Sequence, residues 1–350
     1  MHDPSQFRSY LNKQEHYPNF LRFFQQKVEE HGWQTVAREY LLKGDEQAND
    51  LLARLFAGFL HPLIHLGFGV EFNQPAIVVE ALTQAALHDN YLQPFFLGAE
   101  KAAEAKKAEE ASKTLPRLLD DIRADKRLST AAHWDDNNKI RDGILKRASN
   151  EMIGYASQWT VDPDSLEEKT AEMINAVVYY TGCAQHPPKQ IKLDFYFMHC
   201  VNCSIFFSTF VKQPWLDIKD KVRLLEWKGR NDLVMYASRR SPEPLLDEVI
   251  NYQPRDMPVK RVACWDQIFD RVANFQEDGH ACKMIRALAH GEQASKPYEG
   301  STQFRIKGDM WLKLGSMVMD SVQDTGKTWV RSAGFEEAWD TFDDRRRPQL

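Results

Sequence analysis

The sequence has few of the residues that mark several large classes of protein. It contains only five cysteines among 350 residues. That number is too small, and odd, for the disulfide framework of a secreted protein. The residues that follow Met1 show no charged-then-apolar signal pattern. We therefore expect a protein of a reducing compartment, the cytoplasm.

Long apolar runs and basic blocks are scarce as well. Three uncharged runs stand out, at residues 55–70, 173–188 and 195–211, and each is shorter than the roughly 20 apolar residues that span a membrane. Acidic residues outnumber basic ones by 50 to 45, without any basic block, which argues against nucleic-acid binding. The runs predict buried core segments, and we expect neither a membrane nor a nucleic acid as partner.

Glycine and strand-like alternation are rare, whereas helical spacing of apolar residues is common. The spacing predicts helices over residues 50–66, 76–87, 219–236 and 265–290. Pro62 lies inside the first pattern and should kink or restart that helix. Gly291 resembles a helix stop. With no repeat and no clear linker, the simplest prediction is a mainly α protein with one large helical domain over residues 1–350.

The sequence also lacks the usual cofactor and nucleophile motifs. Gly67-Phe68-Gly69 has neither the third glycine nor the preceding strand of a dinucleotide-binding loop. No Gly-x-Ser-x-Gly sequence is present. A flavin or nicotinamide site is therefore not encoded in a recognisable motif. Cys200 and Cys203 lack a second cysteine pair, so core packing explains them better than zinc binding does.

Histidines in apolar surroundings are the clearest candidates for chemistry. His61 and His65 lie four residues apart in one uncharged run, and His199 lies in another. His280 and His290 share one predicted helix. Burying an imidazole without partners costs about 1–3 kcal/mol, so each needs a hydrogen bond or a ligand. A backbone hydrogen bond explains any single one, but several together favour an iron or zinc site.

Lys283 follows His280 by three residues, which places both side chains on one helical face. A solvated lysine is one interpretation. The alternative is a buried lysine, whose pKa would be lowered so that the amine is neutral and nucleophilic. Such an amine reacts with carbon dioxide to give a carbamate, and the carbamate oxygens could bind a metal as a carboxylate does.

At these residues the chain resembles the questin oxidase-like family of fungi and some bacteria. The matching stretches are Leu55–Gly69 (LFAGFLHPLIHLGFG), Gln74–Ala76, Leu224–Arg230 and Asp278–Glu292 (DGHACKMIRALAHGE). The resemblance implies a mainly helical fold and oxidative ring opening of anthraquinones in aromatic polyketide biosynthesis. Some members are described as NADPH-dependent Baeyer–Villiger-type oxygenases. One branch resembles non-haem iron dioxygenases with several histidine ligands and a carboxylated lysine.

Carried over by motif, the resemblance implies an Fe(II) site between helices. Its ligands would be His65, His199, His280 and the carbamate of Lys283, with His61 and His290 as second choices. The family also has an N-terminal segment with its own His-rich motif, which has no counterpart from Met1 onward. One expected ligand is thus unmatched, and truncation, a borrowed ligand and loss of the oxygenase chemistry stay open as explanations.

Three hypotheses about function follow. The leading one is a non-haem Fe(II) oxygenase that uses dioxygen to open a ring of an anthraquinone-type aromatic polyketide. The second keeps this substrate but uses NADPH in a Baeyer–Villiger-type oxidation, against which the missing glycine-rich loop counts. The third is a helical binding protein without catalytic activity, whose histidines are satisfied in the core.

Overall fold

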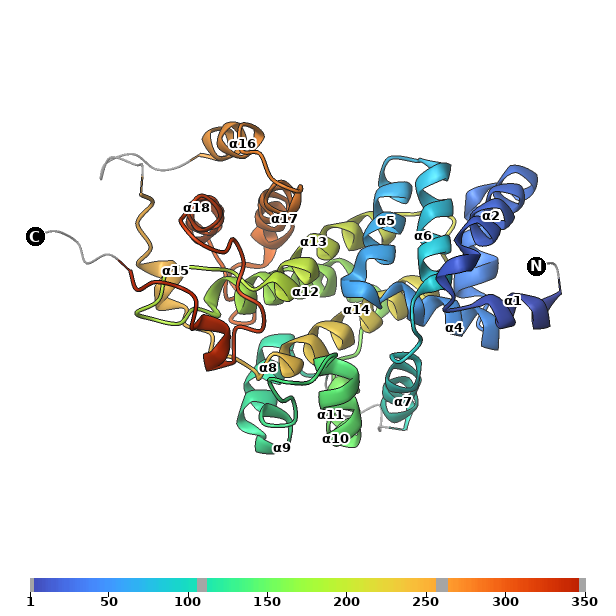
Figure 1. Ribbon diagram of the computed structural model, residues 1–350, viewed down its shortest axis with the longest axis horizontal. Coiled ribbons are helices and arrows are strands. Elements are labelled where there is room, and N and C mark those ends of the chain that lie inside the picture. Colours follow the sequence, from blue (N-terminus) through green and yellow to red (C-terminus); the bar gives the residue numbers. More distant parts are fainter. Residues whose placement is uncertain (1–2, 106–111, 256–263, 346–350) are drawn as a thin grey trace, which may run out of the picture. The chain divides into compact units, whose positions relative to one another are not determined.

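The computed structural model describes residues 3–105, 112–255 and 264–345, which are mainly helical (Figure 1). Within these residues β-structure is limited to two isolated bridges, between Lys189 and Asp344 and between Asp194 and Val330. The mainly α prediction is confirmed. Backbone packing divides the chain into two compact units: unit 1 comprises residues 1–110, 161–166 and 206–228, and unit 2 comprises residues 111–160, 167–205 and 229–350. The extent of a single domain, residues 1–350, stays a prediction.

Unit 1 begins with α1 (Pro4–Tyr10) and α2 (Tyr17–His31), whose phenylalanines form an aromatic cluster with Tyr40. It continues with α3 (Trp33–Ala37), η2 (Arg38–Leu42), α4 (Glu46–Leu55), η3 (Gly58–Leu60), α5 (His61–Glu71), α6 (Pro75–Leu87) and α7 (Gln93–Glu104). The helices α5 and α6 lie side by side (Figure 1). A Cβ atom on Gly69 would lie 2.6 Å from Cγ2 of Val78, so only glycine permits this close packing.

The predicted break at Pro62 is confirmed. The helix α4 ends at Leu55, and a new helix, α5, begins at His61 with Pro62 in its first turn, where proline costs no hydrogen bond. The predicted helix over residues 76–87 corresponds to α6.

Most of the remaining helices lie in unit 2. They are α8 (Leu115–Ala124), α9 (Lys126–Ser129), η4 (Lys139–Ile144), α10 (Leu145–Arg147), α11 (Ser149–Ala156), α15 (Asp247–Ile250), α16 (Trp265–Ala273), α17 (His280–Ser295), η6 (Lys296–Tyr298), α18 (Met310–Val322) and η7 (Glu336–Trp339). Three longer helices, α12 (Leu166–Cys183), α13 (Phe195–Phe210) and α14 (Ile218–Ser238), have residues in both units. The short helix η5 (Pro163–Ser165) belongs to unit 1.

The core of unit 2 is aromatic. Tyr180 of α12 contacts Phe197 of α13 and Tyr236 of α14, with ring centroids 4.8 and 5.5 Å apart. The helix α13 is apolar on all sides, as expected for a helix buried in a core. Cys200 and Cys203 are buried and form no disulfide, in agreement with core packing.

Two details of the predicted helix over residues 265–290 are wrong. The chain breaks after Ala273, and α17 starts only at His280, after Gly279 with its positive φ of 86°. Gly291 does not stop this helix, which continues to Ser295. A Cβ atom on Gly291 would lie 2.7 Å from the ring of Trp311 on α18. This glycine therefore permits close helix packing and does not act as a cap.

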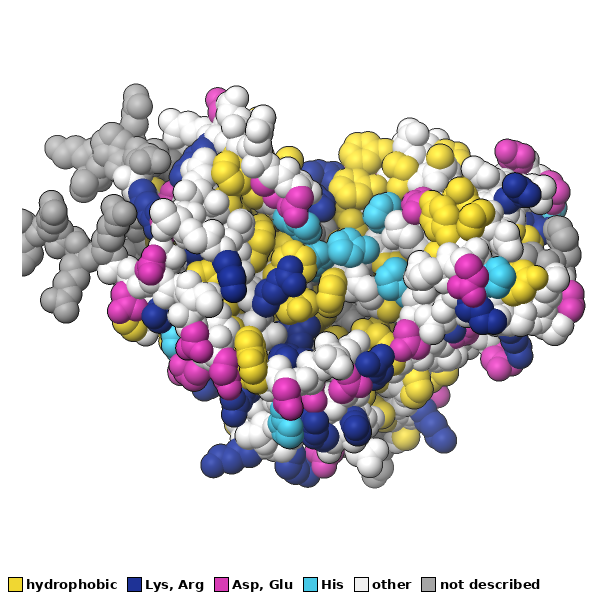
Figure 2. Space-filling model, viewed as in Figure 1, with side chains coloured by type: hydrophobic (Ala, Val, Ile, Leu, Met, Phe, Trp, Pro, Cys, Tyr) yellow, Lys and Arg dark blue, Asp and Glu magenta, His cyan; other side chains and the backbone are white. Residues whose placement is uncertain are grey.

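Acidic and basic side chains are interspersed over the face shown in Figure 2. No single helix of the described ranges is long and apolar enough to cross a membrane, although α4 and residues 58–71, bent by 70°, pass the criteria of length and composition as a pair.

Candidate functional site: a histidine pair in unit 2

His199 lies near the start of α13, and contacts within the first turns of this helix fix its position. The fully buried carboxylate of Asp194 caps this helix by accepting the backbone N–H groups of Tyr196 and Phe197, at 2.8 and 3.1 Å. One turn further on, His199 is 1% exposed, and its Nδ1 lies 2.6 Å from the carbonyl oxygen of Phe195. A carbonyl oxygen only accepts hydrogen bonds, so Nδ1 carries the proton. In the neutral ring, the lone pair is therefore on Nε2.

His280 is the first residue of α17, and two carboxylates fix it. Glu277 accepts the backbone N–H groups of His280 and Ala281, at 2.9 and 3.1 Å. Asp278 Oδ1 lies 2.5 Å from His280 Nδ1. A carboxylate on Nδ1 leaves the Nε2 lone pair available and makes it more basic. Burial raises the pKa of Asp278, but hydrogen bonds, first among them that from His280, outweigh this effect and leave the pKa below its usual value.

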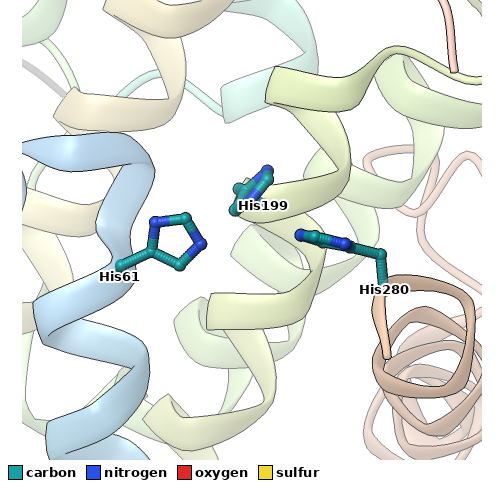
Figure 3. A group of neighbouring side chains, drawn as sticks. All are labelled: His61, His199 and His280. Atoms are coloured by element: carbon teal, nitrogen blue, oxygen red, sulfur yellow. The ribbon is translucent and has the colours of Figure 1, made fainter. Parts of the chain in front are cut away.

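The rings of His199 and His280 lie side by side, with centroids 5.1 Å apart and planes at 64° (Figure 3). The Nε2 atom of His280 is buried and has no hydrogen-bond partner among the described residues. A buried nitrogen lone pair without a donor is costly unless a proton donor or a cation meets it. Neutral imidazole nitrogen is a good ligand for Fe(II) and Zn²⁺, so these residues fit the metal that the family resemblance implies.

The other predicted ligands on α17 are placed differently. Lys283 lies one turn after His280, is half-buried, and has an amine without a hydrogen bond or ion pair to the described residues. His290 lies ten residues along the same helix, a rise of about 15 Å, so the structure does not bring it to His280. The ligand roles of both residues stay predictions.

His61 and His65 belong to α5 of unit 1 (Figure 3 labels His61). His65 Nδ1 lies 2.9 Å from the His61 carbonyl, and His61 Nδ1 lies 2.8 Å from the Gly58 carbonyl. Both neutral rings therefore have the same tautomer as His199. Phe59 and Leu60, just before His61, have positive φ values of 56° and 67°. Such strain in bulky residues concentrates at functional sites. As metal ligands, these histidines stay predictions.

Aromatic and cationic groups adjoin the pair. The ring of Phe195 lies 4.7 Å from the ring of His199 and 5.4 Å from that of His280. The guanidinium of Arg331 lies over the same phenylalanine ring, 4.6 Å from its centroid. Sequence reasoning missed Phe195, Arg331 and Asp278. Of these, only Asp278 could have been found from the sequence, because it stands two residues before His280 in the same motif.

Unit 2 also contains a polar cavity of about 830 Å³ elsewhere. The residues that line it include Asp247, Tyr252, Arg255 and Asp324. His199 is not one of them, and the lining has no wall of apolar aromatic side chains. A cavity of this composition does not suit an aromatic substrate, so the histidine pair is the better candidate for chemistry.

Comparisons with known proteins show which family the chain resembles. A profile of the questin oxidase-like family matches residues 1–288. The chain is 40% identical over 346 residues to a Baeyer-Villiger oxidase, ptaJ, of Pestalotiopsis fici, covering 97% of this chain and 77% of the relative. It is 40% identical over 348 residues to a questin oxidase of Aspergillus fumigatus, with the same coverage. An oxidoreductase of Aspergillus parasiticus, AflY, is 39% identical over 376 residues, covering 98% and 75%.

Proposed function

We propose that this chain, which belongs to the questin oxidase-like family, is an oxidoreductase that opens a ring of an anthraquinone-type aromatic polyketide with Fe(II) and dioxygen. The main support for the proposal is the buried Nε2 of His280, which has no hydrogen-bond partner among the described residues and belongs to a ring that lies next to that of His199. The names of the relatives, questin oxidase and Baeyer-Villiger oxidase, support the reaction class.

Residues of unit 2 would prepare the metal site without rearrangement. Asp278 and the Phe195 carbonyl hold the protons of His280 and His199 on Nδ1, so that in each neutral ring the lone pair is on Nε2. The two neutral rings would therefore bind a metal through Nε2 without a change of tautomer. Bound Fe(II) would supply the activation of dioxygen toward an electron-rich ring.

The remaining predicted ligands are proposed on sequence grounds. His65 is the first choice on α5, and His61 is the second. Lys283 would contribute as a carbamate, formed when its neutral amine adds carbon dioxide and releases one proton. Its position one turn after His280 on α17 is compatible with this role.

A second candidate is an NADPH-dependent Baeyer–Villiger oxidation. The names of several relatives favour a Baeyer–Villiger reaction, and the use of NADPH is what the family resemblance implies. The two reactions differ in their balance of atoms and electrons. A dioxygenase places both atoms of dioxygen in the product and consumes no external reductant. A Baeyer–Villiger monooxygenase places one atom in the product, reduces the other to water, and oxidises one NADPH.

Turnover of a hydroxyanthraquinone under ¹⁸O₂, with and without NADPH, tests the proposal, with the substrate supplied as the quinone and, separately, as the hydroquinone, whose two extra hydrogens balance the incorporation of both oxygen atoms. We expect two labelled oxygen atoms per product, no NADPH oxidation, and loss of activity in His280→Ala. The matched control is His133→Ala, because His133 is an exposed histidine of the same unit. One labelled atom with one NADPH oxidised would establish the second candidate. Unchanged ring opening in His280→Ala would overturn the assignment of the site.

A further inference from the structure

Arg331 lies beside the histidine pair and has no anionic partner among the residues that the structure describes. Its guanidinium lies over the ring of Phe195, 4.6 Å from the ring centroid, and that ring contacts both His199 and His280. Arg331 is exposed and makes no hydrogen bond or ion pair within residues 3–105, 112–255 and 264–345. A stacked guanidinium keeps its N–H donors in its own plane, directed outward. They are therefore available to a ligand that lies beside the phenylalanine ring.

The backbone holds Arg331 in this place. The N–H of Phe195 donates to the carbonyl of Val330 at 2.8 Å, and the N–H of Val330 donates to the carbonyl of Leu193 at 3.1 Å. On the other side of Arg331, the N–H of Ala333 donates to Asp194 Oδ2 at 2.7 Å. Val330 and Ala333, on either side of the arginine, are thus tied to the segment that starts α13.

Asp194 joins the two parts of this arrangement. One of its oxygens caps the helix that carries His199, and the other holds the loop that carries Arg331. All three of its bonds go to backbone N–H groups, so this buried side chain, together with the backbone bonds of Val330, ties the loop of Arg331 to the start of the helix that carries His199. Ser332, inside the loop, has a positive φ of 75°, a conformation that persists only where surrounding contacts impose it.

From this placement we infer that Arg331 is a specificity-determining residue that binds an anionic oxygen, a phenolate or carboxylate, on the aromatic substrate. The inference rests on the proposed function, since it assumes an aromatic substrate at the histidine pair. Guanidinium donors match such oxygens well, and hydrogen bonds to charged groups are the strong ones. Binding a hydroxyl group as phenolate releases its proton to solvent and makes the ring more electron-rich, as an oxygenation requires.

The test measures binding without turnover, by anaerobic absorbance titration of the iron-loaded full chain. The probes are 2-hydroxyanthraquinone, anthraquinone-2-carboxylate and the neutral 2-methoxyanthraquinone. We expect Arg331→Gln to weaken binding of at least one anionic probe by about 10-fold or more, with little change for the methoxy compound. Arg331→Lys should lie between Arg331→Gln and wild type. If the phenol is the bound group, its phenolate absorbance should appear at lower pH in wild type than in Arg331→Gln.

Arg240→Gln is the matched control, because Arg240 is an exposed arginine of unit 2 that lies over a different ring, that of Phe335. It should bind all three probes as wild type does. Unchanged affinity of Arg331→Gln for both anionic probes, or an equal loss for the methoxy compound, would overturn the inference while leaving the proposed function intact. Wild-type protein that binds neither iron nor any of the probes would instead overturn both.

Discussion

Replacing Asp278 by Asn should weaken metal binding without unfolding the protein. The Asp278 carboxylate lies 2.5 Å from His280 Nδ1, and its side chain is 69% exposed. The Asn oxygen can still accept the Nδ1–H, so the ring should keep its orientation but lose the negative charge that raises its basicity. Loss of such a carboxylate typically lowers metal affinity 10- to 100-fold, about 1.4–2.7 kcal/mol.

The assay is competition for Fe(II) against a chelator of known affinity, with thermal unfolding of the metal-free protein measured in parallel. The free energy of unfolding should change by less than about 0.5 kcal/mol, because exposed ion pairs contribute little to stability. Asp270→Asn is the control, since Asp270 is exposed on α16 of the same unit. Equal iron affinity in Asp278→Asn and wild type would refute the idea that Asp278 prepares His280 as a ligand.

Three further predictions concern stability and modification. Gly67→Ala should destabilise the protein by about 1–3 kcal/mol, because a Cβ atom there would lie 2.2 Å from Cγ of Phe206; an unchanged melting temperature would contradict this. The hydrogen bond from Arg147 lowers the pKa of Asp136 to about 2, so this pair stabilises the fold above the usual aspartate pKa and ceases to do so as the pH falls through about 2. Asp136→Asn should therefore cost about 1.5 kcal/mol at pH 7 and much less near pH 2 in urea unfolding, whereas a pH-independent difference would be inconsistent with the ion pair. Finally, ¹³C NMR of protein equilibrated with ¹³C-bicarbonate should show a carbamate signal that is absent in Lys283→Arg; an identical signal in the variant would place the carbamate elsewhere.

Local patterns in the sequence predicted much of the fold. Pro62 predicted the restart of the helix as α5, because proline fits the first turn of a helix; α4 itself ends earlier, at Leu55. The uncharged run at residues 195–211 predicted a buried core segment, and the helix that it forms, α13, is buried because it has no polar face to turn toward water. The prediction that Gly291 ends a helix was wrong, because a glycine that ends a helix and one that admits Trp311 look alike in sequence.

The site was less accessible to sequence reasoning, for a different physical reason. A histidine in an apolar run predicts a buried imidazole. Which ring nitrogen carries the proton, however, is set by partners such as Asp278 or the Phe195 carbonyl. Those partners depend on where a helix starts, which is the least certain part of a prediction. Arg331 lies about fifty residues after His280 and reaches the site only through the backbone bonds of Val330 and Ala333. No local pattern encodes such a long-range pairing.

The most direct test of the central claim is the iron content of the purified chain, measured by elemental analysis after anaerobic reconstitution. Wild type and His133→Ala should each retain about one iron per chain, whereas His199→Ala and His280→Ala should retain almost none, because each loses one ligand of the site. If the His199 and His280 variants were folded and held as much iron as wild type, the histidine pair would not be the metal site.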